Sequence, residues 1–112
     1  IVGLDIFDTS SVTTMYYMFS GYNGTTLDLS SFDTSNVTNM GYMLYNMANI
    51  KTIYASDKFD TSKATYSDGM FYKSTNLVGG AGTKFDSTKT DKSYARIDGG
   101  TSSPGYFTAK NN

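Results

Sequence analysis

A short motif that recurs along the chain constrains the fold more than any other feature of the sequence. Its clearest copy runs from Phe32 to Met40 and reads FDTSNVTNM. Related copies begin at Phe7 and Phe59, and a shorter one begins at Phe85, so the phenylalanines lie 25, 27 and 26 residues apart. A fixed period of this size is typical of stacked structural units, which bury their apolar faces against one another.

Composition excludes several classes of function. The chain has 112 residues, which is enough for one domain, and its net charge of −1 gives no basic field for nucleic acid or an anionic membrane. Cys and His are absent, which removes disulfides, the usual catalytic triads and the usual ligands of zinc. We therefore expect no catalytic residues, no cofactor and no metal. Because no run of about 18 apolar residues occurs, we also expect no membrane insertion.

The second repeat shows how each unit is expected to fold. Leu27 and Leu29 alternate with polar residues, which predicts a strand with one buried face. The apolar residues after the turn recur at the spacing of one face of a short helix: Val37, Met40, Met43 and Leu44. The first repeat has the same pattern at Val12, Met15, Met18 and Phe19, so we expect these methionine columns to belong to the core.

The ends of the chain differ from the central repeats. Residues Ile1 to Phe7 predict a short strand, and its apolar side chains would need cover from further repeats or another domain upstream. After Val78 the helix pattern is lost, and glycine-rich turns alternate with two possible strands, 94–98 and 106–108. This segment predicts a cap that closes the core.

The repeated pattern resembles that of the BspA-like leucine-rich repeat surface proteins, a family also described as DUF285. The closest stretch is Leu27 to Leu44, and the ending from Tyr94 to Thr108 is similar to the ending common in that family. The third repeat departs from the pattern, with Ala64, Ser67 and Gly69 in its helix. The resemblance implies a bacterial protein that is exported, anchored or lipid-linked, and that adheres to host proteins, matrix proteins or other bacteria. It brings no catalytic residues with it.

The sequence therefore predicts an α/β fold, a short right-handed solenoid of leucine-rich-repeat type with a strand and a short helix in each 25–27-residue repeat. We expect three repeats at about 1–26, 27–52 and 53–78, followed by a degenerate fourth repeat and a β-rich C-terminal cap at 79–112.

The repeated aspartates form one predicted column: Asp8, Asp33, Asp60 and Asp86. A ladder of Ca²⁺ ions is one interpretation, since hard cations take carboxylate oxygens. The favoured interpretation is a structural one, in which each carboxylate caps its own turn. Each Asp precedes Thr-Ser or Ser-Thr, as a cap requires, and no calcium-loop motif occurs.

Five tyrosines are the candidate ligand-binding residues: Tyr16, Tyr17, Tyr42, Tyr45 and Tyr72. Stacking of the repeats would align them in stripes, and exposed tyrosines are favoured at protein interfaces and can stack on sugars. The alternative is half-buried padding between repeats, and the sequence leaves both open. Specificity would reside where the copies vary, in three sets: Tyr16/Gly41/Asp68, Ser20/Tyr45/Tyr72 and Ser11/Asn36/Lys63.

For function, these observations favour a non-catalytic extracellular binding module on a bacterial surface, which would hold a protein ligand from a host, a matrix or another bacterium. One alternative is a structural stalk or end-cap without its own ligand. Another is carbohydrate binding through the tyrosine stripes. We do not expect an enzyme.

Overall fold

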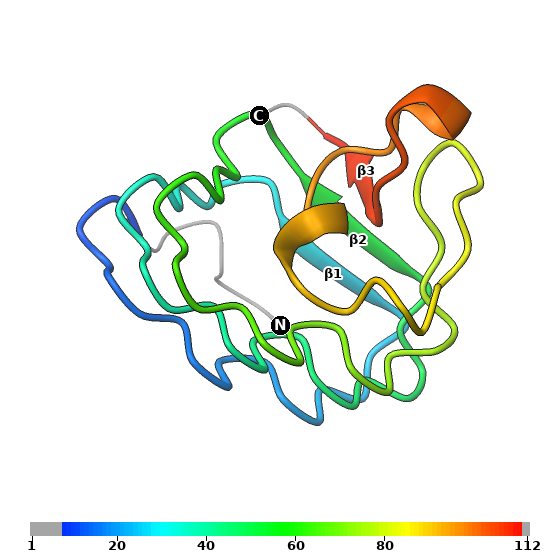
Figure 1. Cartoon of the computed structure of the whole chain (residues 1–112), viewed down its shortest axis with the longest axis horizontal. Helices are drawn as coiled ribbons and strands as arrows, with labels where there is room; N and C mark the ends of the chain where they lie inside the picture. The colour runs from blue at the N-terminus through cyan, green and yellow to red at the C-terminus, as the bar shows by residue number, and fades with distance from the viewer. Residues whose placement is uncertain (1–7, 111–112) are drawn as a thin grey trace.

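The computed structural model describes residues 8–110, and the strand predicted at Ile1 to Phe7 lies outside that range. The described residues contain three short strands, β1 (Thr26–Leu29), β2 (Thr52–Ala55) and β3 (Phe107–Ala109). They form one parallel sheet in the order β1-β2-β3 (Figure 1). Two 3₁₀ helices, η2 (Lys92–Tyr94) and η3 (Gly100–Ser102), belong to the C-terminal segment.

Register in the sheet aligns the apolar positions of the strands. Leu27 lies opposite Ile53, and Ile53 lies opposite Phe107, and all three side chains are buried. Since alternate residues of a strand point to opposite faces, this register gives the sheet one continuous apolar face.

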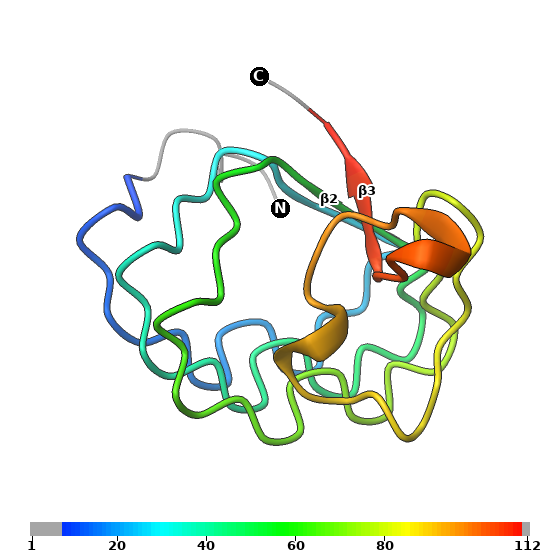
Figure 2. The same ribbon diagram turned by 45° about the horizontal axis from the view of Figure 1, so that its top comes forward.

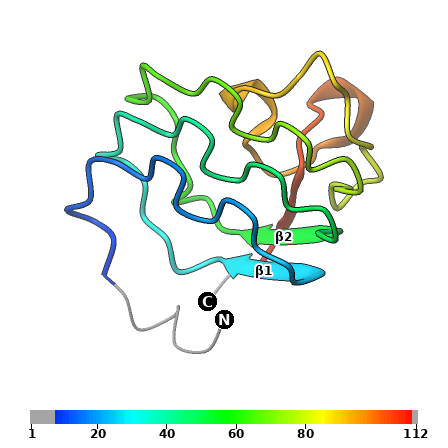
Figure 3. The ribbon, with the colours of Figure 1, turned by 90° about the horizontal axis from the view of Figure 1, so that it is seen from below.

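The predicted solenoid with a strand and a helix in each repeat is wrong. Between residues 8 and 110 there is no α-helix. The three segments predicted to be helical, 12–19, 37–44 and 64–71, each consist of irregular chain with one isolated bridge residue, followed by turns. Figure 3 shows these irregular segments stacked one above another, on the side of the molecule away from β1 and β2.

The hydrogen bonds of these turns explain why no helix forms. The Met18 N–H donates to the Met15 carbonyl within a turn, at 3.1 Å, whereas the Tyr17 N–H donates to the Gly41 carbonyl of the next repeat, at 3.0 Å. The same bonds between repeats recur at every second residue, from the N–H groups of 15, 17, 19 and 21 to the carbonyls of 39, 41, 43 and 45. An α-helix would use these N–H groups for bonds inside one repeat.

The core lies between the sheet and the turns, which Figure 2 shows on opposite sides of the molecule. Four-residue turns bring apolar side chains inward at nearly the spacing of a helix, and Met40, Met43 and Leu44 are fully buried. Met18 is an exception to the predicted methionine columns, because it is 43% exposed in the first repeat. Aromatic rings fill the C-terminal end, where Phe71 and Tyr106 are 4.9 Å apart.

The C-terminal segment differs in detail from the predicted cap. Residues 94–98 do not form a strand: η2 ends there, and only Ile97 makes a single bridge, to Phe107. The strand predicted at 106–108 is observed one residue later, as β3. The buried Tyr106 hydroxyl donates to the Lys89 carbonyl at 2.8 Å and accepts from the Asp86 N–H at 3.0 Å. This hydroxyl therefore joins the segment after Phe85 to β3.

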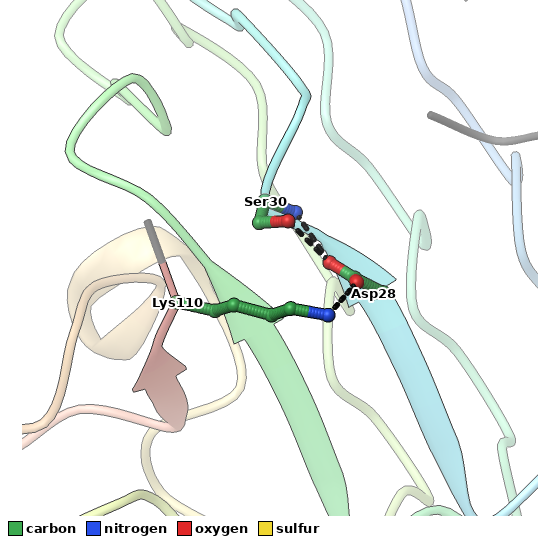
Figure 4. Close-up of polar contacts among 3 residues, drawn as sticks. All are labelled: Asp28, Ser30 and Lys110. Atoms are coloured by element: carbon green, nitrogen blue, oxygen red, sulfur yellow. Dashed lines mark hydrogen bonds and ion pairs between the residues drawn. The ribbon is translucent and has the colours of Figure 1, made fainter. Parts of the chain in front are cut away.

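An ion pair joins the end of the described chain to the other side of the sheet. Lys110 Nζ lies 2.6 Å from Asp28 Oδ2, and the N–H and hydroxyl of Ser30 both donate to Asp28 Oδ1 (Figure 4). Both charged side chains are close to half exposed, so solvent screens the pair and it contributes little to stability.

Candidate binding surface

Six tyrosines from three repeats contact one another on the turn segments of the molecule. They are the five tyrosines predicted from the sequence and one more, Tyr66. Two pairs are stacked across neighbouring repeats: Tyr17 on Tyr42, with ring centroids 4.9 Å apart, and Tyr45 on Tyr72, at 6.0 Å. The rings within each pair are nearly parallel, with interplanar angles of 11° and 9°.

Edge-to-face contacts join these pairs into one group, which we call the tyrosine surface. Tyr42 meets Tyr45 at 5.4 Å, and Tyr16 meets Tyr17 at 4.5 Å. Tyr66 lies 6.3 Å from Tyr16. Offset stacks and edge-to-face contacts are the favoured arrangements of aromatic pairs, so the six rings support one another.

The backbone positions two of these rings in an unusual conformation. Tyr17 and Tyr42 occupy equivalent places in the first and second repeats, and their φ angles are 58° and 52°. Each is the third residue of a hydrogen-bonded turn that requires positive φ, as a type II turn does. The third repeat has Gly69 at this place, with φ 64°. A bulky residue in this region is an outlier that the surrounding structure must stabilise.

Glycines make room for the rings. A Cβ atom at Gly69 would lie 2.3 Å from the Tyr42 ring, and one at Gly41 would lie 2.3 Å from the Tyr66 ring. Glycine therefore stands at the variable position 41 and at position 69 because a neighbouring tyrosine covers each of them.

The outer rings of the tyrosine surface are open to solvent. Tyr16 and Tyr72 are each 49% exposed, and Tyr17 and Tyr66 are also exposed, whereas the central Tyr42 and Tyr45 are half-buried. Lys73 lies at one margin, with Nζ 5.7 Å from the centroid of the Tyr72 ring. Both interpretations of the tyrosines therefore apply in part. The central rings pack beneath the outer ones, and the outer rings are accessible to a ligand.

Two phenols of this surface, those of Tyr17 and Tyr66, have raised pKa values. Desolvation by the neighbouring groups raises the pKa of Tyr17, and the adjacent tyrosines add to the effect. The pKa of Tyr66 is also raised, first by desolvation and then by the charge of Asp68. The raised pKa values favour the protonated hydroxyls of Tyr17 and Tyr66, which can donate hydrogen bonds.

Sequence reasoning missed Tyr66, although a signal was present. Tyr66 is seven residues after Phe59, the place that Thr14 and Asn39 occupy in their repeats. Parallel bridges join Thr14 to Asn39 and Asn39 to Tyr66, so the three form one column. Comparing the copies at every position, rather than only at aromatic columns, identifies it.

The aspartates bind the backbone of their own turns. Asp33 accepts from the N–H and the hydroxyl of Ser35, at 3.0 and 2.6 Å. Asp8, Asp60 and Asp86 likewise accept from the residue two positions later. These hydrogen bonds lower the pKa of all four carboxyls. In the described part of the chain, no three potential ligands among His, Cys, Asp and Glu come together as a metal site would require.

Buried threonines beside the aspartates connect the repeats, which the sequence did not reveal. The Thr34 hydroxyl accepts from the Asp60 N–H at 2.6 Å and donates to the Asp60 carbonyl at 2.9 Å. Thr9 makes the same two bonds to Asp33. The variable set Ser11/Asn36/Lys63 also makes hydrogen bonds within the protein. Lys63 donates to Asn36, and Asn36 donates to the Ser10 carbonyl. This leaves the tyrosine surface as the better candidate for a ligand.

No helix within residues 8–110 has the length and apolar character needed to cross a bilayer.

Comparison with known proteins identifies the family. No curated protein and no solved structure matches the chain. A family model described as "Mycoplasma protein of unknown function, DUF285" matches residues 2–102, which is most of the chain. The repeats, the turn-forming aspartates and all six residues of the tyrosine surface fall inside this range, and the chain belongs to the DUF285 family.

Proposed function

We propose that this protein is a non-catalytic binding module of a bacterial cell surface, and that the tyrosine surface holds a protein ligand. The observation that supports it best is the cluster of six mutually contacting tyrosines, four of them exposed. Tyrosine is enriched among the residues that dominate binding energy at protein interfaces. Its ring supplies contact area while its hydroxyl supplies a hydrogen bond.

The backbone strain supports the same proposal. Positive φ at a residue other than glycine costs about 1–2 kcal/mol, and glycine at the same place in the third repeat avoids that cost. The backbone conformation at Tyr17 and Tyr42 is therefore less favourable than it would be with glycine at the same positions. Strain of this kind clusters at functional sites, which suggests a role for the two rings beyond packing.

The extracellular location and the adhesive role rest on the resemblance to BspA-like surface proteins. Host proteins, matrix proteins and surface proteins of other bacteria are the partners that this resemblance suggests. An antibody against the chain should label intact cells that carry the gene. Labelling only after permeabilisation would overturn the proposed location.

Binding can be tested by interferometry of the purified chain against a panel of purified matrix proteins. The variant Tyr16→Ala/Tyr72→Ala removes the two most exposed rings and leaves the two strained backbone positions unchanged. A loss of about 2 kcal/mol in binding free energy, or roughly 30-fold in Kd, is expected. The control is Tyr54→Ala, a half-buried tyrosine of β2, which should leave Kd unchanged.

Two outcomes would contradict the proposal. Equal binding by the wild type and the folded double variant would show that the tyrosine surface is not the contact face. Binding of a glycan array that depends on Tyr16 and Tyr72, with no binding of proteins, would instead favour the carbohydrate alternative.

A further inference from the structure

The stacked pair of Tyr17 and Tyr42 has a geometry suited to a covalent reaction between the two side chains. Their centroids are 4.9 Å apart and their planes differ by only 11°, so the two phenols are held beside each other in a nearly parallel stack. Tyr17 is 43% exposed, which gives an oxidant access to the pair. Holding two reactants in such an arrangement converts a bimolecular reaction into an effectively unimolecular one.

We propose that Tyr17 and Tyr42 form an oxidative modification site, at which a peroxidase and hydrogen peroxide couple the two phenols into dityrosine. The link would join the first repeat to the second. The proposal needs only the stacked pair, so it does not depend on the binding function.

The reaction balances with hydrogen peroxide as the oxidant. Each phenol loses one electron and its phenolic proton, and the two electrons and two protons reduce one peroxide to two waters. The two tyrosyl radicals then form a carbon–carbon bond between ring carbons ortho to the oxygens. Each of these carbons loses its proton as the phenolic oxygen regains one, which restores both aromatic rings.

Composition directs oxidation toward these rings. The chain has no Cys, the residue whose thiolate is usually oxidised first, and no Trp. Met18 is an exposed methionine and competes for peroxide, but its product, the sulfoxide, gains an oxygen atom and is distinguished by mass.

Other tyrosine rings contact the stacked pair of Tyr17 and Tyr42. Tyr16 and Tyr45 contact Tyr17 at 4.5 and 6.1 Å, and Tyr45 contacts Tyr42 at 5.4 Å. A radical formed on an exposed ring thus lies beside further phenols. The parallel stack of Tyr17 and Tyr42 is the closest face-to-face contact among the tyrosines of the described chain, so coupling is expected there.

The test treats dilute folded protein with horseradish peroxidase and hydrogen peroxide, and follows dityrosine by its fluorescence. Cleavage before aspartate then places Tyr17 in peptide 8–27 and Tyr42 in peptide 33–56. Mass spectrometry of the monomer fraction should find these peptides joined, with a mass lower than their sum by two hydrogen atoms.

Three variants keep the rings and locate the bond. Tyr17→Phe and Tyr42→Phe should each abolish the joined peptide, because phenylalanine preserves the stack but has no phenol. Tyr54→Phe, in the same peptide as Tyr42 but on β2 and outside the tyrosine surface, should retain the joined peptide at the wild-type yield. Circular dichroism checks that all three variants are folded.

Several outcomes would overturn the proposal. One is dityrosine found only between molecules. Another is a link confined to peptide 8–27, which would come from Tyr16 and Tyr17. A third is an equal yield of the joined peptide from protein unfolded in urea, since that would show that the folded geometry contributes nothing.

Discussion

The carboxylate of Asp98 accepts two hydrogen bonds from Thr83, one from its N–H at 2.9 Å and one from its hydroxyl at 2.7 Å. The N–H groups of Ala81, Gly100 and Gly105 also donate to Asp98, which is buried. One carboxylate therefore joins the turn after Val78 to the loop before β3. It is a buried charge stabilised by hydrogen bonds from backbone and hydroxyl groups.

Replacing Asp98 should destabilise the C-terminal segment strongly. Asp98→Asn removes the charge and places an amide N–H₂ among groups that are themselves donors. We expect the free energy of unfolding to fall by about 3 kcal/mol, because buried donors would lose a charged acceptor. Urea denaturation measures the change. Asp57→Asn, at an exposed position, should stay within about 0.5 kcal/mol of wild type, and an equally small effect at Asp98 would contradict this account.

Stability should fall in acid, and Asp98 should account for a measurable part of the loss. Burial alone would raise the pKa of Asp98, but its hydrogen bonds from Thr83, Gly100 and Ala81 outweigh burial and hold the pKa far below its usual range. Since the unfolded value is about 3.9, the stabilisation is complete above about pH 4–5 and is lost as the pH falls toward the folded value. Melting temperatures from neutral pH to about pH 2 should decline less steeply for Asp98→Asn than for wild type. Parallel curves for the two proteins would refute this assignment.

Thr34 should contribute more to the stability of the fold than the size of its side chain suggests. Its hydroxyl is fully buried and makes two hydrogen bonds to the Asp60 backbone. Thr34→Val keeps the shape but leaves the Asp60 N–H and carbonyl without this partner, so the expected loss is about 2 kcal/mol in the free energy of unfolding. Thr65→Val is the matched control, because that hydroxyl is exposed and its bond to the Thr38 carbonyl is long, at 3.4 Å. Similar losses for both variants would show that burial of the bond is not the cause.

Gly69 should tolerate no side chain while the Tyr42 ring keeps its place. Gly69→Ala combines a positive φ of 64° with a Cβ that would overlap the Tyr42 ring. Gly82→Ala isolates the first effect, because Gly82 has φ 94° and open space around it. We expect Gly82→Ala to cost about 1 kcal/mol and Gly69→Ala clearly more, as measured by thermal denaturation. Equal costs would mean that the ring moves aside without loss.

The repeat and its strands could be predicted from the sequence because they depend on local pattern. Leu27 and Leu29 alternate with polar residues, and the copies of the motif lie 25–27 residues apart, which places the strands of adjacent repeats side by side. The helices could not be excluded in this way. A four-residue turn and a helix both bring Met40 and Met43 inward, and the spacing of apolar residues does not distinguish the two.

The candidate surface was only partly predictable for a related reason. Columns of tyrosine follow from the period, but which rings stack depends on the backbone at Tyr17 and Tyr42, whose positive φ no propensity rule assigns to tyrosine. The reason for glycine at positions 41 and 69 is that tyrosine rings cover them, and this is seen only in the tertiary structure.

The sequence by itself determined that this chain is built from repeats, that aspartate and serine or threonine form their turns, and that tyrosines align between copies. Only the tertiary structure decided that the backbone N–H groups of residues such as Tyr17 and Met40 bond to the next repeat. The physical reason is that a backbone N–H can be satisfied within a helix or by a neighbouring chain segment. The choice depends on whether that neighbour is in register, which local sequence does not specify.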